Sequence, residues 1–335
     1  MNKSLKGKIV FLLFLVFVFG QKIKSQKSQF NKKHQQLYEF QKFKKEHGKS
    51  YESSEHESYR FNVFLENKKQ ALKLKKEMPT AEFGVTKFSD LTEEEFVDLY
   101  ANGVISTDYD TFESYLQSNL DSQQQIPKQW DIRINGPGYM QPVQDQGCCG
   151  SCWAFTVVST IENLYSIKYN QNVTLSEQQL LDCDMNDGGC NGGWFTNAYK
   201  YVQENGLALQ SRYPYIGIRN KCLASEVGQL YKINGFVKLP SDINSIKQAL
   251  VQKGAIATCV FVAGRWMSYK QGILKVPRQN HCNKAVTVIG YGKENDMDFW
   301  IIRNTWGTKW GENGHVRLIM DDCCGIFLNS VFQPI

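Results

Sequence analysis

Cysteine is missing from the first 147 residues of this 335-residue chain, although the rest contains ten, from Cys148 to Cys324. This uneven distribution indicates a boundary between a thiol-free leader and a cysteine-rich body. Neither part has a marked excess of charge: residues 1–125 carry 19 basic and 17 acidic side chains, and residues 126–335 carry 20 and 16. Such a balance gives no support to nucleic-acid binding. A hydrophobic content of 42% excludes a wholly disordered or collagen-like protein.

Apolar runs long enough to cross a membrane are also missing. The run at the N-terminus, Ile9–Phe19, has 11 residues, whereas a spanning helix needs about 20. Three lysines precede it and Gly20 follows it, which is typical of a secretory signal peptide over residues 1–20. We therefore expect no stable membrane span, and a protein of the secretory pathway that ends outside the cell or in a lysosome or vacuole. In that pathway disulfides form, and Asn172-Val173-Thr174 is a candidate glycosylation site.

The organisation of the rest follows from hydrophobic periodicity. Residues 30–78 have apolar side chains at helical spacing, and Asp90–Phe96 is typical of a capped helix start, which predicts a helical core over about 34–100. Residues 101–125 are polar and aperiodic, as in a linker, so that the leader covers 21–125 and the body 126–335. The body begins helical and becomes rich in β-branched residues after about residue 254. This order predicts an α+β fold with two lobes.

The stretch from Gln146 to Phe155 carries the most informative chemistry. Cys152 lies just inside the start of a predicted helix, where free backbone N–H groups and the helix dipole favour a thiolate. This position is typical of a nucleophile, and the Gln146 amide offers a donor to a developing oxyanion. Alternatively, Cys148, Cys149 and Cys152 form half of a zinc site or are all disulfide-bonded. No second pair of cysteine or histidine stands at metal-ligand spacing, so we expect no metal.

Further motifs follow in order along the chain: Ser176–Cys183, Gly189–Gly193, Tyr213–Cys222, Gly290–Gly292 and Trp300–Gly311. Together with Gln146–Phe155 they resemble the papain family of cysteine proteases, in particular its cathepsin L-like branch. Upstream, Gly84–Asp90 resembles a motif of that family's inhibitory propeptide. The resemblance extends over nearly the whole chain. It implies a papain-like fold with a helical left lobe and a β-barrel-like right lobe, preceded by a helical propeptide that occupies the substrate groove until it is cut away within the linker.

The resemblance also implies roles for individual residues. Cys152 is expected to be the nucleophile, Gln146 the oxyanion donor, and Asn304 the residue that orients the catalytic histidine. The groove is expected to be lined by seven residues, which are Gly192, Gly193, Phe195, Cys259, Ala285, Trp306 and Asn329. Disulfides are expected for three pairs, which are Cys149–Cys190, Cys183–Cys222 and Cys282–Cys324.

Histidine is scarce in the body. A thiolate protease needs a proton carrier that titrates near the working pH, and histidine is the usual one. The chain has five histidines, but only His281 and His315 lie in the body. In the family the catalytic histidine directly precedes an Ala-Val pair, and here Lys284 holds that place. His315 falls at a family position far from the groove. His281 lies three residues before Lys284, and on an extended chain this odd displacement points its side chain to the opposite face.

Two arrangements would keep a working base. If Cys282–Lys284 is a short insertion, His281 becomes the catalytic residue. Alternatively, Lys284 is itself the base, although a neighbouring thiolate raises the pKa of an amine and opposes this role. In any other case the site has lost its base.

The sequence therefore predicts a papain-like cysteine endopeptidase that is made as a secreted or lysosomal zymogen and whose activity depends on residue 284. Its substrates are expected to be peptides or proteins, and its own propeptide is expected to inhibit it. The alternative is a catalytically inactive papain-fold protein that binds peptides. We expect no cofactor, no nucleic-acid partner, and a monomer after maturation.

Overall fold

A computed structural model describes residues 27–104, 120–121, 123–136, 138–277, 279, 281–320 and 331–335. The predicted signal peptide, most of the predicted linker, and Cys323, Cys324 and Asn329 lie outside these ranges. The chain divides into two compact units, Met1–Asn67 and Lys68–Ile335.

The first unit is helical. Residues 27–47 form one helix, and α2 (Ser54–Glu77) begins in this unit. Phe40 and Phe43 are buried and pack on Phe64 with ring centroids 5.4 and 5.0 Å apart. Apolar side chains at helical spacing therefore meet on one face of each helix, as the periodicity predicts.

Parts of the leader also lie in the second unit. The short strand β1 (Ala81–Phe83) pairs antiparallel with β5 (Tyr269–Leu274). Helix α3 (Glu93–Tyr100) is capped by the preceding residue, Thr92, whose hydroxyl accepts from the Glu95 N–H while the Glu95 carboxylate accepts from the Thr92 N–H. These two bonds make a capping box, which satisfies two backbone donors at the helix start.

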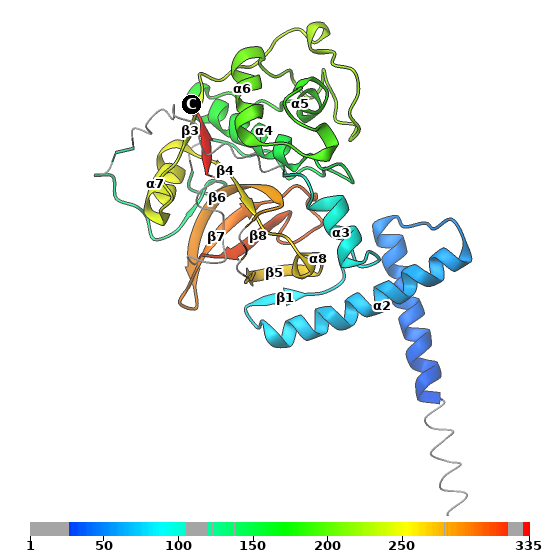
Figure 1. The fold of residues 1–335 in the computed structure, drawn as a ribbon. Coiled ribbons are helices and arrows are strands. Elements are labelled where there is room, and N and C mark those ends of the chain that lie inside the picture. Colours follow the sequence, from blue (N-terminus) through cyan, green and yellow to red (C-terminus); the bar gives the residue numbers. More distant parts are fainter. Residues whose placement is uncertain are drawn as a thin grey trace, which may run out of the picture. The chain divides into compact units, whose positions relative to one another are not determined.

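The first part of the body is helical (Figure 1). It consists of α4 (Cys152–Tyr169), α5 (Glu177–Cys183), α6 (Phe195–Asn205) and the short η2 (Gly189–Asn191). Helix α4 is buried along most of its length and packs against both α5 and α6. A helix that is apolar on nearly all sides lies inside a fold, and α4 accordingly forms the centre of the helical lobe.

The second part of the body is built on a sheet. Among the described residues its strand order is β1-β5-β8-β7-β6-β4-β9-β3, and β2 pairs with β6. The remaining strands are β2 (Trp130–Asp131), β3 (Phe236–Lys238), β4 (Ile256–Val260), β6 (Lys284–Glu294), β7 (Met297–Arg303), β8 (His315–Ile319) and β9 (Phe332–Pro334). The remaining helices are η3 (Ala224–Glu226), α7 (Ile243–Lys253) and α8 (Gly264–Met267). Both α4 and α7 pack on β6, so β6 joins the two lobes. The predicted two-lobed α+β fold is confirmed.

Within the described part of the chain, no helix is both long and apolar enough to cross a bilayer.

Three disulfides join described cysteines. Two of them, Cys149–Cys190 and Cys183–Cys222, are pairs that the resemblance implies. The expected pair Cys282–Cys324 is wrong, because Cys282 is bonded to Cys259. Strands β4 and β6 pair so that Cys259 stands opposite Ala285, and the segment leading into β6 therefore passes close to β4. Exposed Cys148 and buried Cys152 have free thiols.

Candidate active site

Cys152 is the first residue of α4 and is fully buried. Its Sγ accepts a hydrogen bond from the backbone N–H of Ala285 in β6, at 3.4 Å. The thiol thus lies where the helical lobe meets the sheet, at the positive end of the α4 dipole. Both this dipole and the Ala285 N–H favour negative charge on sulfur.

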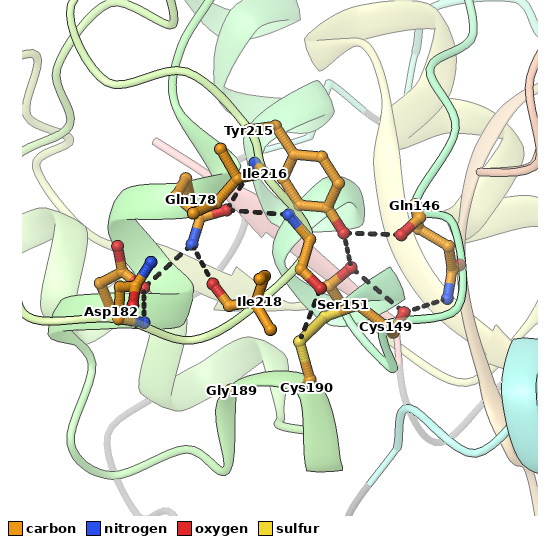
Figure 2. Close-up of a disulfide and its surroundings, with 12 residues drawn as sticks. Gln146, Cys149, Ser151, Gln178, Asp182, Gly189, Cys190, Tyr215, Ile216 and Ile218 are labelled. Atoms are coloured by element: carbon orange, nitrogen blue, oxygen red, sulfur yellow. Dashed lines mark hydrogen bonds between the residues drawn. A yellow bond between two sulfur atoms is a disulfide. The ribbon is translucent and has the colours of Figure 1, made fainter.

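The loop before α4 is held in place from two sides (Figure 2). The Cys149–Cys190 disulfide fixes one side. On the other side, the Tyr215 hydroxyl donates to the Gln146 backbone carbonyl at 2.7 Å and lies 2.8 Å from the Ser151 hydroxyl. The Gln146 side chain donates one amide N–H to the Cys149 carbonyl at 2.7 Å. An amide has two such N–H groups, so one is left for a developing oxyanion.

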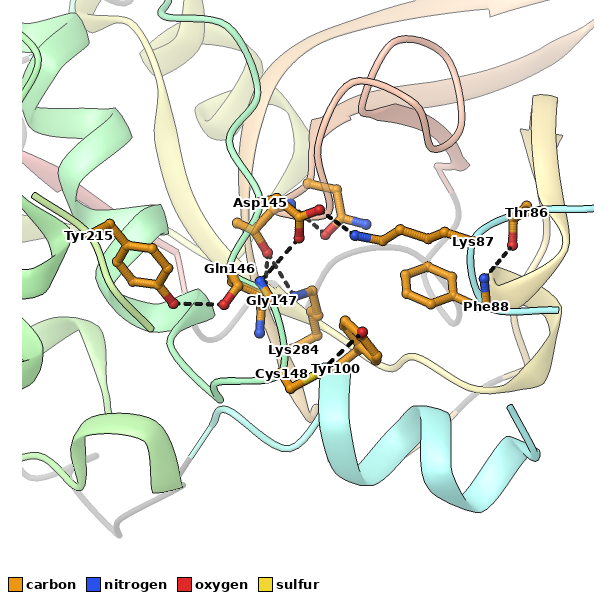
Figure 3. A network of polar contacts seen from close by, with 12 residues as sticks. Thr86, Lys87, Phe88, Tyr100, Asp145, Gln146, Gly147, Cys148, Tyr215 and Lys284 are labelled. Carbon is orange, nitrogen blue, oxygen red and sulfur yellow. Dashed lines mark hydrogen bonds and ion pairs between the residues drawn. The ribbon is translucent and has the colours of Figure 1, made fainter. Parts of the chain in front are cut away.

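Lys284 begins β6 and is fully buried beside this loop (Figure 3). Its Nζ donates to the Gln146 side-chain carbonyl and, at 2.8 Å, to the Thr305 hydroxyl. It lies 4.8 Å from the centre of the Trp306 ring, over its face. The ammonium form therefore has two oxygen acceptors and an aromatic face within reach.

Burial lowers the pKa of Lys284 to about 8, and the Cys152 thiol opposes this shift. The raising effect of the neighbouring sulfur, which is expected from the sequence, is therefore present, but the cost of removing a charge from water is the larger effect. The positive charge of Lys87, in the leader, lowers the pKa further. Lys87 is ion-paired with Asp145 at 2.5 Å (Figure 3).

Neither histidine of the body lies beside Cys152 in the described structure. His281 is exposed, and its ring packs edge-on against Phe261 at 5.1 Å. His315 lies in β8, where its Nδ1 is 3.0 Å from the Asn313 carbonyl and burial lowers its pKa to about 4. The insertion alternative placed His281 at the thiol, whereas the structure brings Lys284 to Gln146 instead.

Asn304 does not orient a base in this structure. Its Oδ1 accepts from the Thr305 backbone N–H at 2.8 Å, and its buried Nδ2 has no partner among the described residues. The neighbouring Thr305 contacts Lys284 instead. No sequence pattern points to Thr305, because a threonine next to a site residue is ordinarily a packing residue.

The expected groove contains the leader. Val104 forms a parallel bridge with Gly193, whose N–H donates to the Gly103 carbonyl at 3.3 Å. Gly103 lies over Cys152 so closely that a Cβ there would be 2.6 Å from the Cys152 Sγ. The first residues of the predicted linker therefore cover the thiol, which the polarity of that segment did not reveal.

Val104 packs against a cluster that contains three of the expected groove residues, Phe195, Cys259 and Ala285. The sulfur of Cys259 is in the disulfide with Cys282. Trp306 is buried under Phe88 and Phe96 of the leader, at ring-centroid distances of 5.1 and 5.3 Å. Leader side chains thus cover both the groove and the ring beneath Lys284.

Two buried carboxyl groups, which the sequence did not single out, lie next to this groove. Asp187 accepts from the Trp194 N–H at 3.0 Å and from the Asn197 amide at 3.1 Å, whereas its Oδ2 and the Oδ2 of Asp184 are buried and have no hydrogen-bond partner in the described structure. A Cβ on Gly193 would be 2.8 Å from the Asp187 carboxyl carbon. Burial and the charge of Asp184 raise the pKa of Asp187 to about 8. One proton held between these two carboxyl groups would give both unpartnered oxygens a partner, so we expect the pair to share one.

Replacing Asp187 with asparagine is expected to make stability less sensitive to pH. Because its pKa is raised, Asp187 holds a proton that the unfolded chain releases between about pH 4 and pH 8, so stability falls as pH rises through that window. An asparagine amide would donate to Asp184 at every pH. At pH 8.5 we expect Asp187→Asn to unfold about 2 to 10 °C above the parent, which corresponds to a gain of about 1 to 3 kcal/mol in the free energy of unfolding. The difference should be smaller at pH 5.

Thermal unfolding of the full chain in a Cys152→Ala background, which prevents self-processing, measures this effect. Asp296→Asn makes the same chemical change at a fully exposed side chain and serves as the control. Asp184 also feels the charges of Arg219 and Glu204, and buried Glu162 and Glu177 titrate in the same direction. Only the difference between variants therefore isolates the acid pair. Equal pH dependence of Asp187→Asn and its parent would contradict the shared proton.

In the described part of the chain, no group of three or more histidine, cysteine or acidic side chains is arranged to hold a metal ion.

Comparison with known proteins identifies the family of this chain. The family model described as papain family cysteine protease matches residues 126–333, and that of the cathepsin propeptide inhibitor domain matches residues 40–96. A cathepsin L-like proteinase from Phaedon cochleariae is 37% identical over 85% of this chain and 89% of its own length. Papaya proteinase 4 from Carica papaya is 34% identical over 85% of this chain and 83% of its own.

Solved structures show the same fold with its leader. Digestive procathepsin L 3 of Tenebrio molitor has a TM-score of 0.79 and 29% identity, over 89% of this chain and 98% of that chain. The proform of the ragweed pollen cysteine protease Amb a 11 has a TM-score of 0.79 and 30% identity, over 90% and 94%. This chain therefore belongs to the papain family of cysteine proteases and carries that family's inhibitory propeptide domain.

Proposed function

We propose that this chain is the zymogen of a cysteine endopeptidase in which the Cys152 thiolate pairs with the ammonium of Lys284, where relatives use an imidazolium. Residues 1–20 are the signal peptide, 21–125 the propeptide and 126–335 the peptidase. The protein enters the secretory pathway, acts in a lysosome, a vacuole or outside the cell, and takes peptides or proteins as substrates. It works as a monomer without cofactor or metal.

The placement of Lys284 carries this proposal. Its amine is buried and bonded to the side chain of the oxyanion donor Gln146, and the N–H of the next residue, Ala285, donates to the Cys152 Sγ at 3.4 Å. A cation beside a thiol stabilises the thiolate, which is the nucleophile. The first half of the reaction, attack on a peptide carbonyl, therefore retains its thiolate nucleophile.

The second requirement, a proton for the departing amide nitrogen, is met less well. Removal of the propeptide takes away the charge of Lys87, which lowers the pKa of Lys284, and uncovers Trp306 under the amine. Both changes return the pKa of Lys284 toward its ordinary value of about 10.4, at which an ammonium is a poor acid. We therefore propose that the mature enzyme forms a reactive thiolate but hydrolyses peptides slowly.

One observation favours the alternative, an inactive peptide-binding protein. The buried Nδ2 of Asn304 has no partner in the described structure, as expected where the group that this residue would orient has been lost. This alternative keeps the groove and forecasts no turnover at all.

Three proteins distinguish these functions: wild type, Cys152→Ala and Lys284→Met. Each full chain is processed with an added serine endopeptidase, which is then blocked with an inhibitor of its own class. We expect iodoacetamide to alkylate Cys152 at least about tenfold faster in wild type than in Lys284→Met at pH 6.5, because methionine removes the neighbouring charge. Equal alkylation rates would refute the ion pair.

Hydrolysis of a fluorogenic dipeptide then separates the two candidates. Slow turnover by wild type that is lost in Cys152→Ala supports the endopeptidase. Wild-type turnover no higher than that of Cys152→Ala would establish the inactive protein instead.

A further inference from the structure

Building on the proposed ion pair, we infer that Thr305 is the positioning residue of Lys284, and that it has taken over the orienting role that the resemblance gives to Asn304. The inference rests on hydrogen bonds that join Thr305, Lys284 and Gln146 into one closed network.

The direction of each bond in this network is fixed by its chemistry. The Gln146 amide nitrogen faces the Cys149 carbonyl, so its Oε1 is the acceptor turned toward the other two side chains. The Thr305 hydroxyl donates to this Oε1 at 2.5 Å. Its oxygen is then the acceptor for the Lys284 Nζ at 2.8 Å. Each of the three side chains thus holds the other two.

The network leaves one position of the amine free for proton exchange. Two N–H groups of Lys284 go to Gln146 and Thr305. A neutral amine keeps two N–H groups and an ammonium has three, so both protonation states satisfy the two acceptors. Only the third position gains or loses a proton. Among the described residues no hydrogen bond from it is present, and the Cys152 thiol acts on the charge of this amine.

Asn304 is unsuited to this role for a lysine. An ammonium offers only donors, and the Asn304 Nδ2 is itself a donor. The acceptor of Asn304, its Oδ1, is already used by the Thr305 backbone N–H. The acceptor that the Lys284 amine uses instead is the hydroxyl of the next residue, Thr305.

The test compares Thr305→Val with Thr305→Ser. Valine has the shape of threonine but cannot accept from Lys284, whereas serine can. Proteins processed as above, in a Cys148→Ser background that leaves Cys152 as the free thiol among the described cysteines, are alkylated with iodoacetamide between pH 5 and pH 10. The alkylated position is located by mass spectrometry. Dipeptide hydrolysis is followed over the same range.

Removing an acceptor disfavours the ammonium form of Lys284 and so lowers its pKa. In Thr305→Val, the part of the alkylation-rate profile that reports this pKa should therefore move about one pH unit to lower pH. Hydrolysis should fall about tenfold at pH 6.5, mostly in kcat. Thr305→Ser should restore both. Thr287→Val removes another buried hydroxyl, which bonds Ser159 away from the site, and should leave the profile unchanged.

If the pH profile of Thr305→Val matches that of wild type while the profile of Lys284→Met differs from it, the positioning role of Thr305 is overturned. A Lys284→Met profile identical to wild type would instead refute the ion pair itself, so the two failures are distinguishable. If the valine variant does not fold, Thr305→Ala removes the same acceptor without filling its place. Failure of Thr305→Ser to restore the profile would also contradict the inference.

Discussion

Lys284→His is expected to raise peptide hydrolysis by the processed enzyme about 100- to 10,000-fold, which is the usual contribution of a general acid–base. Histidine has an ordinary pKa of about 6.5, so near neutral pH it both takes the thiol proton and returns it to the leaving nitrogen. It also gives the Asn304 side chain, whose Nδ2 has no partner in the described structure, a ring to orient. The measurement is kcat/KM on one fluorogenic dipeptide for wild type and variant.

The matched control is His281→Ala. His281 is exposed and packs on Phe261, so we expect less than about a twofold change when it is removed. The insertion alternative forecasts the opposite pattern, in which His281→Ala abolishes a clear wild-type activity and Lys284→His adds nothing. That pattern would show that the segment before β6 rearranges on maturation and that Lys284 is not at the site.

The sequence predicts the start of α4 and the two lobes well because these depend on local patterns. Cys152 at the start of α4 follows from apolar periodicity after a glycine-containing loop, and the capping box at Thr92 follows from residue types three positions apart. The scarcity of histidine is likewise readable, because the whole chain has only five.

Properties that depend on burial and on contacts between distant segments are not readable in this way. The pKa of Lys284 is lowered mainly by its burial, which the sequence does not give. The bond between Cys259 and Cys282 follows from the pairing of β4 with the strand that Cys282 precedes. Thr305 accepts a hydrogen bond from the amine because β6 brings Lys284 next to it.

Gly103→Val is expected to expose the nucleophile of the uncut zymogen. A Cβ at residue 103 would be 2.6 Å from the Cys152 Sγ and 2.8 Å from the Gly150 carbonyl oxygen, and the second of these is backbone that cannot turn away. Forcing atoms into a packed site costs about 1 to 3 kcal/mol. Since alkylation of a buried thiol requires local opening, Cys152 in the uncut variant should react about 10- to 100-fold faster than in wild type.

Asn102→Ala is the control for this variant, because residue 102 is exposed and adjacent, and its change to alanine introduces no clash. Alkylation of Cys152 is located by mass spectrometry on protein whose mass shows that it is uncut. A folded Gly103→Val protein with wild-type protection of Cys152 would mean that the leader is held elsewhere, for example by the pairing of β1 with β5. If labelling is faster in Gly103→Val and not in Asn102→Ala, the contact of Gly103 with the sulfur is what keeps this thiol unreactive until the propeptide is removed.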